Sequence, residues 1–346
     1  MPSRFVKINP MLSQKWWNFI HEHPDITIFH HPNWMLLLNK QYGYTPKAYG
    51  IKNDDGELTA GQPLMKVNGG KLTSLPFTDY CNPLYKTQED LEELIDNISK
   101  IQKEQNIEIR WSIPKHNGFT QTADCVLHTI NLDNDPQKIF NNFKHSHRKN
   151  IKKALRENLD VEIDITKDGI EKFYKIHTKN RQRLGVPVQP KRFFRLLWKY
   201  LINENLGFVL LVYKSGNPIA GGVFLHYNRI LTAKYSGADP EYLSLRPMNL
   251  IFWWAIQWGC HNGYKTFDFG KTQLANTGLR RFKDGWGTVE KPLKYYTLNK
   301  QSSNTEKTIE SDLMEKTMDF LSQKTIQSTP IFVCRLTGEL LYKYFG

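Results

Sequence analysis

The chain has 346 residues, of which 40% are hydrophobic and 23% are charged. This length allows two domains with sizeable cores, and the composition excludes the disordered and fibrous classes of protein. The excess of 47 Lys and Arg over 34 Asp and Glu gives a net charge of +13, which suits an anionic partner such as a nucleotide, a tRNA, a phospholipid surface or a phosphorylated carrier.

The cysteines and the apolar segments indicate the cellular compartment. The four cysteines are scattered and form no CxxC pair, which argues against a structural zinc site or a disulfide framework and favours a reducing environment. The N-terminus has no apolar core of signal-peptide length, and the longest apolar run, at 250–260, is too short to span a bilayer. We therefore expect a cytoplasmic protein without a metal, and leave open a peripheral contact with the inner face of the membrane.

The first 40 residues contain the pair His30-His31, followed by Pro32 and Asn33. Adjacent histidines on one strand point to opposite faces, so they are poorly placed to share a metal ion. Pro and Asn are typical of the first positions of a helix. The pattern favours a strand-to-helix junction over a metal pair.

Two parts of the chain show the same order of predicted elements. Residues 47–80 read as strands separated by turns at 53–56 and 68–70, followed by an amphipathic helix at 88–105 and a strand from Ile107. Residues 207–270 repeat this order, with turns at 214–217 and 228–229, a helix at 249–261 and a strand from Lys265. Gly61 and Gly221 align, and the spacing predicts a degenerate internal duplication.

The two halves are joined by a basic segment. We predict one helix over Ile139–Asn158, in which positions 144–156 carry six Lys or Arg residues and no acidic residue. The basic face of such a helix is either a solvated surface or a binding site for phosphates. The candidate polyanion-binding residues are Arg148, Lys149, Lys152 and Lys153.

Residues 169–203 are predicted to be helical with a break at 185–188. Arg181 and Arg183, near the end of the first helix, are candidates for contact with a phosphate or a carboxylate. An exposed structural role for each is an equal alternative.

Residues 265–295 carry the densest group of candidate functional residues. A strand at 266–269 ends at Gly270 and is followed by Lys271, then by a loop and the run Arg280-Arg281-Phe282-Lys283. Polar groups just beyond the C-terminal end of a strand usually face an open crevice in an α/β sheet. Together with Trp286, which we expect to be exposed, they predict a site for an anionic, partly flat ligand.

The same stretch resembles the signature of the FemAB family, the peptidoglycan bridge-forming aminoacyltransferases and the related FemAB-like acyltransferases. The matching motifs are FDFG-K-T at 267–272, TG-x-x-x-FK-x-x-WG at 277–287 and PL-x-Y at 292–295. The resemblance implies an α+β fold of two tandem GNAT-like domains with mixed sheets flanked by helices, which agrees with the internal repeat. We expect domains at 1–158 and 159–300 and a helical tail at 301–346.

The resemblance also implies an acyltransferase. No Ser-His-Asp or Cys-His arrangement is evident, so direct transfer within a ternary complex fits better than a covalent enzyme intermediate. Lys283 matches the family's FK motif, whose lysine lies near the aminoacyl ester, and we assign it charge stabilisation. Asp268 either accepts a proton from the amine, orients Lys271 or forms a structural hydrogen bond. The candidate substrate-binding residues are Lys271, Arg181, Arg183, Phe282, Trp286, Arg246, Asn249 and Tyr235.

The donor is less clearly indicated. Loop 237–249 occupies the place of the pyrophosphate loop of GNAT proteins, but it lacks the Gly-x-Gly spacing and has Ser244, Arg246 and Pro247 instead. This weakens ordinary acetyl-CoA use, and FemAB proteins take aminoacyl-tRNA. We expect transfer of an aminoacyl or acyl group onto an amine of a cell-wall or polysaccharide precursor, without a cofactor. The alternatives are an N-acyltransferase that uses acyl-CoA, and a non-catalytic basic nucleic-acid-binding or scaffold protein.

Beyond residue 300 we predict a polar linker and two amphipathic helices. The first carries Ile309, Leu313, Met314 and Leu321, and the second carries Phe332, Leu336, Leu340 and Tyr344 at a spacing of four. Few basic residues accompany the second stripe, so we expect the tail to pack on the body rather than lie on a membrane.

Overall fold

The computed structural model describes residues 4–101, 106–299 and 323–344. The first half contains β1 (Phe5–Ile8), α1 (Gln14–Glu22), α2 (Pro32–Tyr42), β2 (Thr45–Lys52), β3 (Leu58–Lys66), β4 (Leu72–Ser74), β5 (Leu84–Tyr85), α3 (Gln88–Lys100) and β6 (Ile107–Ile109). β7 (Thr120–Asn131), α4 (Pro136–Asn142) and α5 (His145–Ala154) lead into the second half.

The second half begins with β8 (Asp160–Asp164), α6 (Lys167–Leu184), α7 (Lys191–Tyr200), β9 (Gly207–Lys214), β10 (Asn217–Tyr227) and β11 (Ile230–Ala238). It continues with the 3₁₀-helix η5 (Pro240–Leu245), α8 (Pro247–His261), β12 (Thr266–Gln273), α9 (Thr277–Asp284) and β13 (Val289–Leu298). Two short helices, α11 (Gln323–Ser328) and α12 (Ile331–Leu341), follow.

The two halves have the same topology. In the first, β1, β2, β3 and β4 pair antiparallel in sequence order, and β6 joins β4 in parallel after the crossover that includes α3. In the second, β8, β9, β10 and β11 pair antiparallel, and β12 joins β11 in parallel after α8. The tandem GNAT-like arrangement predicted from the repeat is therefore confirmed, whereas the domain boundaries remain predictions.

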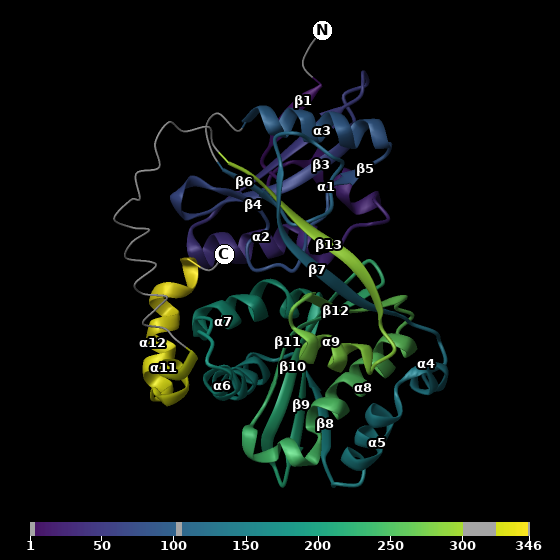
Figure 1. Ribbon diagram of the computed structural model, residues 1–346, viewed down its shortest axis with the longest axis vertical. Helices are drawn as coiled ribbons and strands as arrows, with labels where there is room; N and C mark the ends of the chain where they lie inside the picture. Colours follow the sequence, from purple (N-terminus) through teal and green to yellow (C-terminus); the bar gives the residue numbers. More distant parts are fainter. Residues whose placement is uncertain (1–3, 102–105, 300–322, 345–346) are drawn as a thin grey trace.

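The last strand of each half lies against the other half. β7 follows β6 in the chain but pairs with β12, and β13 follows β12 but pairs with β6. β7 and β13 also pair with each other, so the described strands form one 13-stranded sheet rather than the two sheets that the sequence suggested. Figure 1 shows these two long strands running side by side from one half into the other.

The aligned glycines Gly61 and Gly221 have matching environments. They lie on β3 and β10, which occupy equivalent places in the two halves. A Cβ atom on Gly61 would lie 2.6 Å from the Trp16 ring of α1, and one on Gly221 would lie 2.9 Å from the Phe173 ring of α6. Each glycine thus allows an aromatic side chain to pack directly on the sheet.

The predicted helix over 139–158 is two helices. α4 ends at Asn142, and Phe143 has extended dihedral angles (φ −68°, ψ 146°) before α5 begins. The ring of Phe143 is buried, with centroids 5.7 Å from Trp253 and 5.1 Å from Trp286. The break follows from this side chain, because it enters the core between two helices that cover the surface.

The His30-His31 pair lies at the start of a helix, as the sequence favoured, but the residues before that helix form a 3₁₀-helix (Ile28–His30) and not a strand. His30 is buried, and its Nε2 lies 2.8 Å from the carbonyl oxygen of Asn82. His31 caps α2, where its Nδ1 accepts a hydrogen bond from the backbone N–H of Asn33 at 3.2 Å. No cluster of His, Cys, Asp and Glu suited to a metal ion occurs among the described residues.

The first predicted tail helix, with Ile309 to Leu321, lies outside the described residues. α12 does pack on the body, since Cys334 is buried and a Cβ atom on Gly338 would overlap the carbonyl oxygen of Val188. Phe332 and Leu336, however, are 64% and 59% exposed, so these two residues of the predicted stripe point outward. Within the described ranges every helix is too short or too polar to traverse a lipid bilayer.

Candidate active site

The candidate site is organised around an irregularity in β12. The pairing of β12 with β7 shifts register between Asp268 and Lys271, and Gly270 between them has a positive φ of 71°. A Cβ atom on Gly270 would lie 2.2 Å from Oδ2 of Asp79. Glycine is therefore required here both by the left-handed backbone and by the carboxylate above it. Such bulges often re-aim side chains next to active sites.

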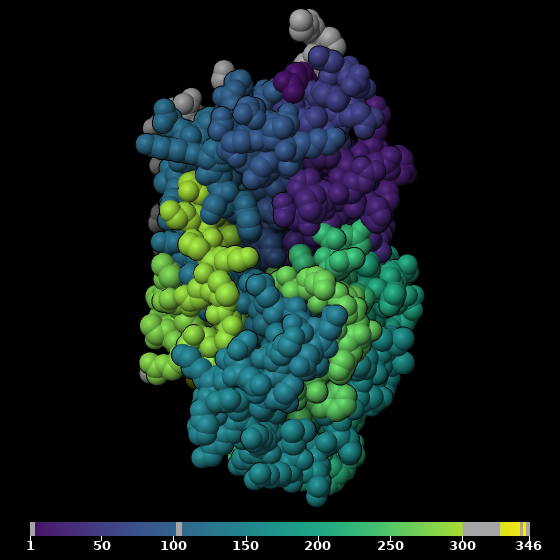
Figure 2. Space-filling model, turned by 90° about the vertical axis from the view of Figure 1, so that its right-hand side faces the viewer, coloured from purple at the N-terminus to yellow at the C-terminus, as the bar shows by residue number. Residues whose placement is uncertain are grey.

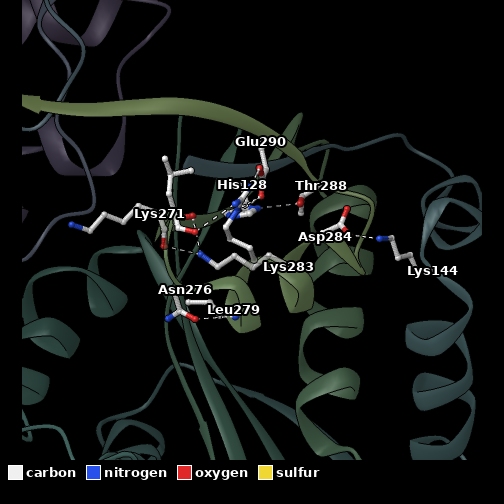
Figure 3. Close-up of polar contacts among 12 residues, drawn as sticks. His128, Lys144, Lys271, Asn276, Leu279, Lys283, Asp284, Thr288 and Glu290 are labelled. Atoms are coloured by element: carbon white, nitrogen blue, oxygen red, sulfur yellow. Dashed lines mark hydrogen bonds and ion pairs between the residues drawn. The ribbon is translucent and has the colours of Figure 1, made fainter. Parts of the chain in front are cut away.

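Lys283 reaches this bulge from α9, a helix that begins where the side chain of Asn276 accepts a hydrogen bond from the N–H of Leu279 at 3.1 Å. The ammonium of Lys283 donates to the carbonyl oxygens of Gly270 and Lys271, both at 2.9 Å (Figure 3). A lysine ammonium has three donors, so one N–H is left over from these two bonds.

Burial decides the electrostatics of Lys283, which is only 6% exposed. Loss of hydration lowers its pKa to about 8, although the nearby carboxylates of Asp79 and Asp268 act in the opposite direction. The side chain therefore stays mostly protonated at neutral pH but can lose its proton within a mildly alkaline range.

Asp268 is held by two partners that the sequence did not indicate. Its Oδ1 accepts from the N–H of Gly270 at 2.7 Å, and its Oδ2 accepts from the hydroxyl of Tyr80 at 2.9 Å. Burial raises its pKa to about 6. These contacts, and not a contact with Lys271, fix the carboxylate.

Lys271 points away from Lys283, as Figure 3 shows. Its ammonium lies 4.4 Å from the ring centroid of Tyr295, and the guanidinium of Arg110 lies 5.8 Å from the same ring. Burial is the main reason that the pKa of Lys271 is lowered. Two cations therefore share one aromatic ring on the first-half side of the site, where an anionic group would be favoured.

Lys234 is a further cation near the site, half-buried, that the sequence analysis missed. Its ammonium donates to the carbonyl oxygen of Phe77 at 2.7 Å, which links β11 to the loop after β4. The ammonium lies between 5.1 and 5.5 Å from three ring centroids, those of Phe29, Trp34 and Tyr235. Burial lowers its pKa. A lysine within the apolar strand ILTAKYSG was a signal for such a position.

His128 completes the polar surroundings of Lys283 on the β7 side. It is buried, with Nδ1 3.3 Å from Oγ1 of Thr288 and Nε2 3.8 Å from Oε1 of Glu290. Glu290 in turn accepts two hydrogen bonds from Arg280, at 3.0 and 2.7 Å. Burial and the charge of Lys283 lower the pKa of His128 to about 4, so the imidazole is neutral at physiological pH.

Several predicted substrate-binding residues lie elsewhere. Arg181 donates twice to the carbonyl oxygen of Pro187, at 3.0 and 2.8 Å, and Arg183 donates to Oδ1 of Asn180 at 3.1 Å. Both arginines therefore stabilise the end of α6 and the turn that follows it. Tyr235 packs against Phe194, with ring centroids 5.3 Å apart, and reaches the site only as part of the rings around Lys234.

Arg246 and Asn249 flank the start of α8. Arg246 is exposed and has a positive φ of 61°. Asn249 is buried, and its Nδ2 has no hydrogen-bond partner among the described residues. An unpaired buried amide at the first turn of a helix is costly, and a bound ligand would satisfy it.

The expectation that Trp286 is exposed is wrong. The side chain is 0% exposed, and its ring lies 5.6 Å from that of Phe252 and 4.9 Å from that of His147. Phe282, which is half-buried, packs against the His147 ring at 5.4 Å. Both aromatic residues of the motif therefore anchor α9 to the core and thereby position Lys283.

The basic residues of α5 form a separate group. Arg148, Lys149, Lys152 and Lys153 line a hollow beside α4, not the bulge in β12. The hollow and the bulge are therefore two distinct places on the molecule.

Comparisons with known proteins agree with this architecture. Residues 141–284 match the family described as "Acetyltransferase (GNAT) domain". The crystal structure of FemX is 13% identical, with a TM-score of 0.63 over 84% of this chain and 96% of FemX. A tandem GNAT protein from the clavulanic acid biosynthesis pathway is 9% identical, with a TM-score of 0.53 over 87% of this chain and 99% of that protein.

The C-terminal domain of a putative lysylphosphatidylglycerol synthetase from Agrobacterium fabrum is 13% identical, with a TM-score of 0.51 over 81% of this chain and 90% of that domain. The search of curated proteins gave no match. At these identities the structural likeness is one of fold, and the family match adds the enzyme class. Residues 141–284 therefore match a GNAT acetyltransferase domain, which supports an acyltransferase, and the chain has the tandem-domain fold that it shares with FemX.

Proposed function

We propose that this chain moves an aminoacyl or acyl group directly from an activated donor onto an amine, with the β12 bulge and α9 as the reaction centre. The observation that carries the proposal is the buried ammonium of Lys283, held by two carbonyl oxygens with one N–H left over. A preorganised donor in a dry site can stabilise the negative charge that develops on a carbonyl or leaving oxygen.

In this reaction the neutral amine nitrogen forms a bond with the acyl carbon, and the bond from that carbon to the leaving oxygen or sulfur breaks. The proton released by the amine ends on the leaving group, so no net proton is consumed. Both carboxylate oxygens of Asp268 are already engaged. We therefore assign the proton transfer to the hydrogen-bonded pair of Tyr80 and Asp268 rather than to the carboxylate alone.

The proposed donor is aminoacyl-tRNA and the proposed acceptor is an amine of a cell-wall or polysaccharide precursor in the cytoplasm, at or near the membrane. The net charge of +13 supports a polyanionic donor. The name of the lysylphosphatidylglycerol synthetase, with which the fold is shared, also denotes the joining of an amino acid to another molecule.

Acyl-CoA is the second candidate donor, favoured by one observation. The unpaired Nδ2 of Asn249 lies in the first turn of α8, where helix N–H groups could also bind phosphate.

A donor competition tests the proposal. The purified protein is incubated with an amine-bearing cell-wall precursor and one of two donors, acetyl-CoA or a mixed pool of aminoacyl-tRNAs. The mass of the acceptor is then measured by mass spectrometry. We expect a gain of one amino-acid residue with aminoacyl-tRNA alone. A gain of an acetyl group would replace the donor by acyl-CoA. No gain with either donor, from protein that melts cooperatively, would contradict the proposal for this acceptor class.

A further inference from the structure

A hollow of about 710 Å³ is lined by residues of α4 and α5. Figure 2 presents the face of the molecule on which these two helices lie. Six basic side chains line it: His145, Arg148, Lys149, Lys152, Lys153 and Arg156. Their spacing along the chain alternates between three and one, which places them on one face of a helix. They therefore form a continuous basic stripe and not a random scatter of charge.

The opposite face of α5 packs on the core, so the basic stripe must face outward. His147, Ile151 and Ala154 are buried. Ile151 and Ala154 belong to the same hydrophobic cluster as Trp253 and Ile256 of α8. Because one face of α5 is committed to the core, the basic face must point outward into the hollow.

The charges of the stripe are nearly uncompensated. Among the described residues, its only ion pair joins Lys153 to Glu157 at 4.0 Å. Lys144, one position before the stripe, is paired with Asp284. Like charges three and four residues apart on a helix repel each other and destabilise it. An anion from outside the chain would remove this cost.

We propose that the hollow between α4 and α5 binds the phosphodiester backbone of a single-stranded nucleic acid. From His145 to Ala154 α5 rises by about 13 Å, while the phosphates of a stacked strand, spaced as in one strand of a duplex, follow one another at about 3.4 Å. The stripe therefore matches several successive phosphates, whereas an isolated phosphate would meet only one or two of its cations.

The shape of the site favours a strand over a membrane. A flat bilayer surface would not follow a concave hollow, whereas a flexible chain of phosphates can enter it. The lining also includes the aromatic ring of Phe140. Grooves that combine cations with aromatic rings are typical of proteins that bind single strands without reading their sequence.

The site abuts the segment that carries Lys283. The backbone N–H of Lys144 donates to the carbonyl oxygen of Gly285 at 2.9 Å, and a Cβ atom on Gly285 would lie 2.2 Å from the His147 ring. A strand bound on α5 would thus lie on the element that supports α9. If the donor is aminoacyl-tRNA, this strand belongs to the donor; that identification alone rests on the proposed function, while the binding does not.

The test measures how the binding of a labelled single-stranded RNA of about 16 nucleotides depends on salt concentration. Binding is detected by the fluorescence anisotropy of the RNA. The variant replaces Lys149, Lys152 and Lys153 by Gln. Each lost phosphate contact on a single strand lowers the slope of log K against log salt by about 0.7. We therefore expect the slope to fall by about two and the affinity at low salt to fall at least tenfold.

The matched control replaces Lys40, Lys86 and Lys115, which are exposed lysines of the first half, by Gln. It removes the same three charges and should leave the slope unchanged. An equal loss in both variants would assign the binding to net charge, and an unchanged slope in the α5 variant would overturn the site. Binding to vesicles with anionic lipids but not to RNA would also overturn it.

Both variants are measured for transfer as well. If the α5 variant loses RNA binding and the wild-type protein uses a donor other than aminoacyl-tRNA, the nucleic-acid site is supported and the proposed donor is contradicted. Intact transfer from aminoacyl-tRNA together with an unchanged salt slope would keep the proposed function and remove this site.

Discussion

Replacing Lys283 by Met removes the buried ammonium but keeps an unbranched apolar side chain of similar length. The variant loses two hydrogen bonds from a charged donor, to the carbonyl oxygens of Gly270 and Lys271. Hydrogen bonds to charged groups contribute about 1.5–3 kcal/mol each, so the loss is about 3–6 kcal/mol.

The gain from removing the buried charge offsets half or more of this loss. The pKa of Lys283 falls from an ordinary 10.5 to about 8 in the folded chain. This lowering corresponds to about 3 kcal/mol of cost for holding the ammonium in its buried place. The net destabilisation expected for Lys283→Met is therefore about 0–3 kcal/mol, which a chain of this size should tolerate.

The expected effect on the reaction is much larger than the effect on folding. Removal of one preorganised donor to a developing oxyanion costs a factor of about 100 to 1,000 in rate. The measurement is single-turnover transfer with donor and acceptor both saturating, beside a thermal melt. Lys271→Met is the control, because the Lys271 ammonium faces the Tyr295 ring and should chiefly support substrate binding.

Two outcomes would refute the assignment of Lys283. A Lys283→Met protein that melts as the wild type does and transfers at the wild-type rate has no need of the ammonium. A protein that melts far below the expected range would show that Lys283 is structural, and slow transfer by such a protein would then support nothing. A Lys271→Met variant that is slowed as much as Lys283→Met at saturation would show that the two lysines do not have separate roles.

Three further predictions concern the same site. The transfer rate should rise with pH as Asp268 ionises near pH 6 and fall as Lys283 loses its proton near pH 8. If the residual rate of Lys283→Met still falls near pH 8, this assignment of the alkaline fall is contradicted. Tyr80→Phe removes a hydrogen bond that lowers the pKa of Asp268, so the acid limb should move to higher pH, and an unmoved limb would separate Tyr80 from the proton transfer. Gly270→Ala should lower the melting temperature more than Gly263→Ala, because both glycines have positive φ but open space surrounds only Gly263; equal melting temperatures would contradict the close approach at Gly270.

The repeated topology could be predicted from the sequence because it depends on local sequence patterns. Hairpin turns, alternating strands and amphipathic helices recur in the same order, and Gly61 and Gly221 mark equivalent strands. The exchange of β7 and β13 has no such local signal. It depends on pairing between strands more than 100 residues apart, for example Leu127 with Lys291, which no spacing within one segment can show.

The candidate site was predictable only where its residues are neighbours in the chain. Asp268, Lys271 and Lys283 lie within one stretch of the chain, residues 265–295, and the structure places them around the same bulge. Tyr80 reaches Asp268 across 188 positions, and no pattern in the loop after β4 marks it. Trp286 was misplaced because Gly-Trp-Gly resembles an exposed loop, whereas its burial depends on contacts from α4–α5 and α8.

The exchanged strands explain why a site in the second half needs the first. The GNAT family match ends at residue 284 and begins at 141, so it covers Lys283 and Asp268 but none of the loop after β4. Yet the hydroxyl on Asp268 comes from Tyr80, and the partner of the Lys234 ammonium is a carbonyl of Phe77. Because β13 bridges β6 and β7, the two halves cannot separate without breaking the sheet beside the site. The first half therefore forms a fixed wall of the proposed reaction centre, and we expect changes in its loop at 75–83 to alter the chemistry rather than only the docking of a second domain.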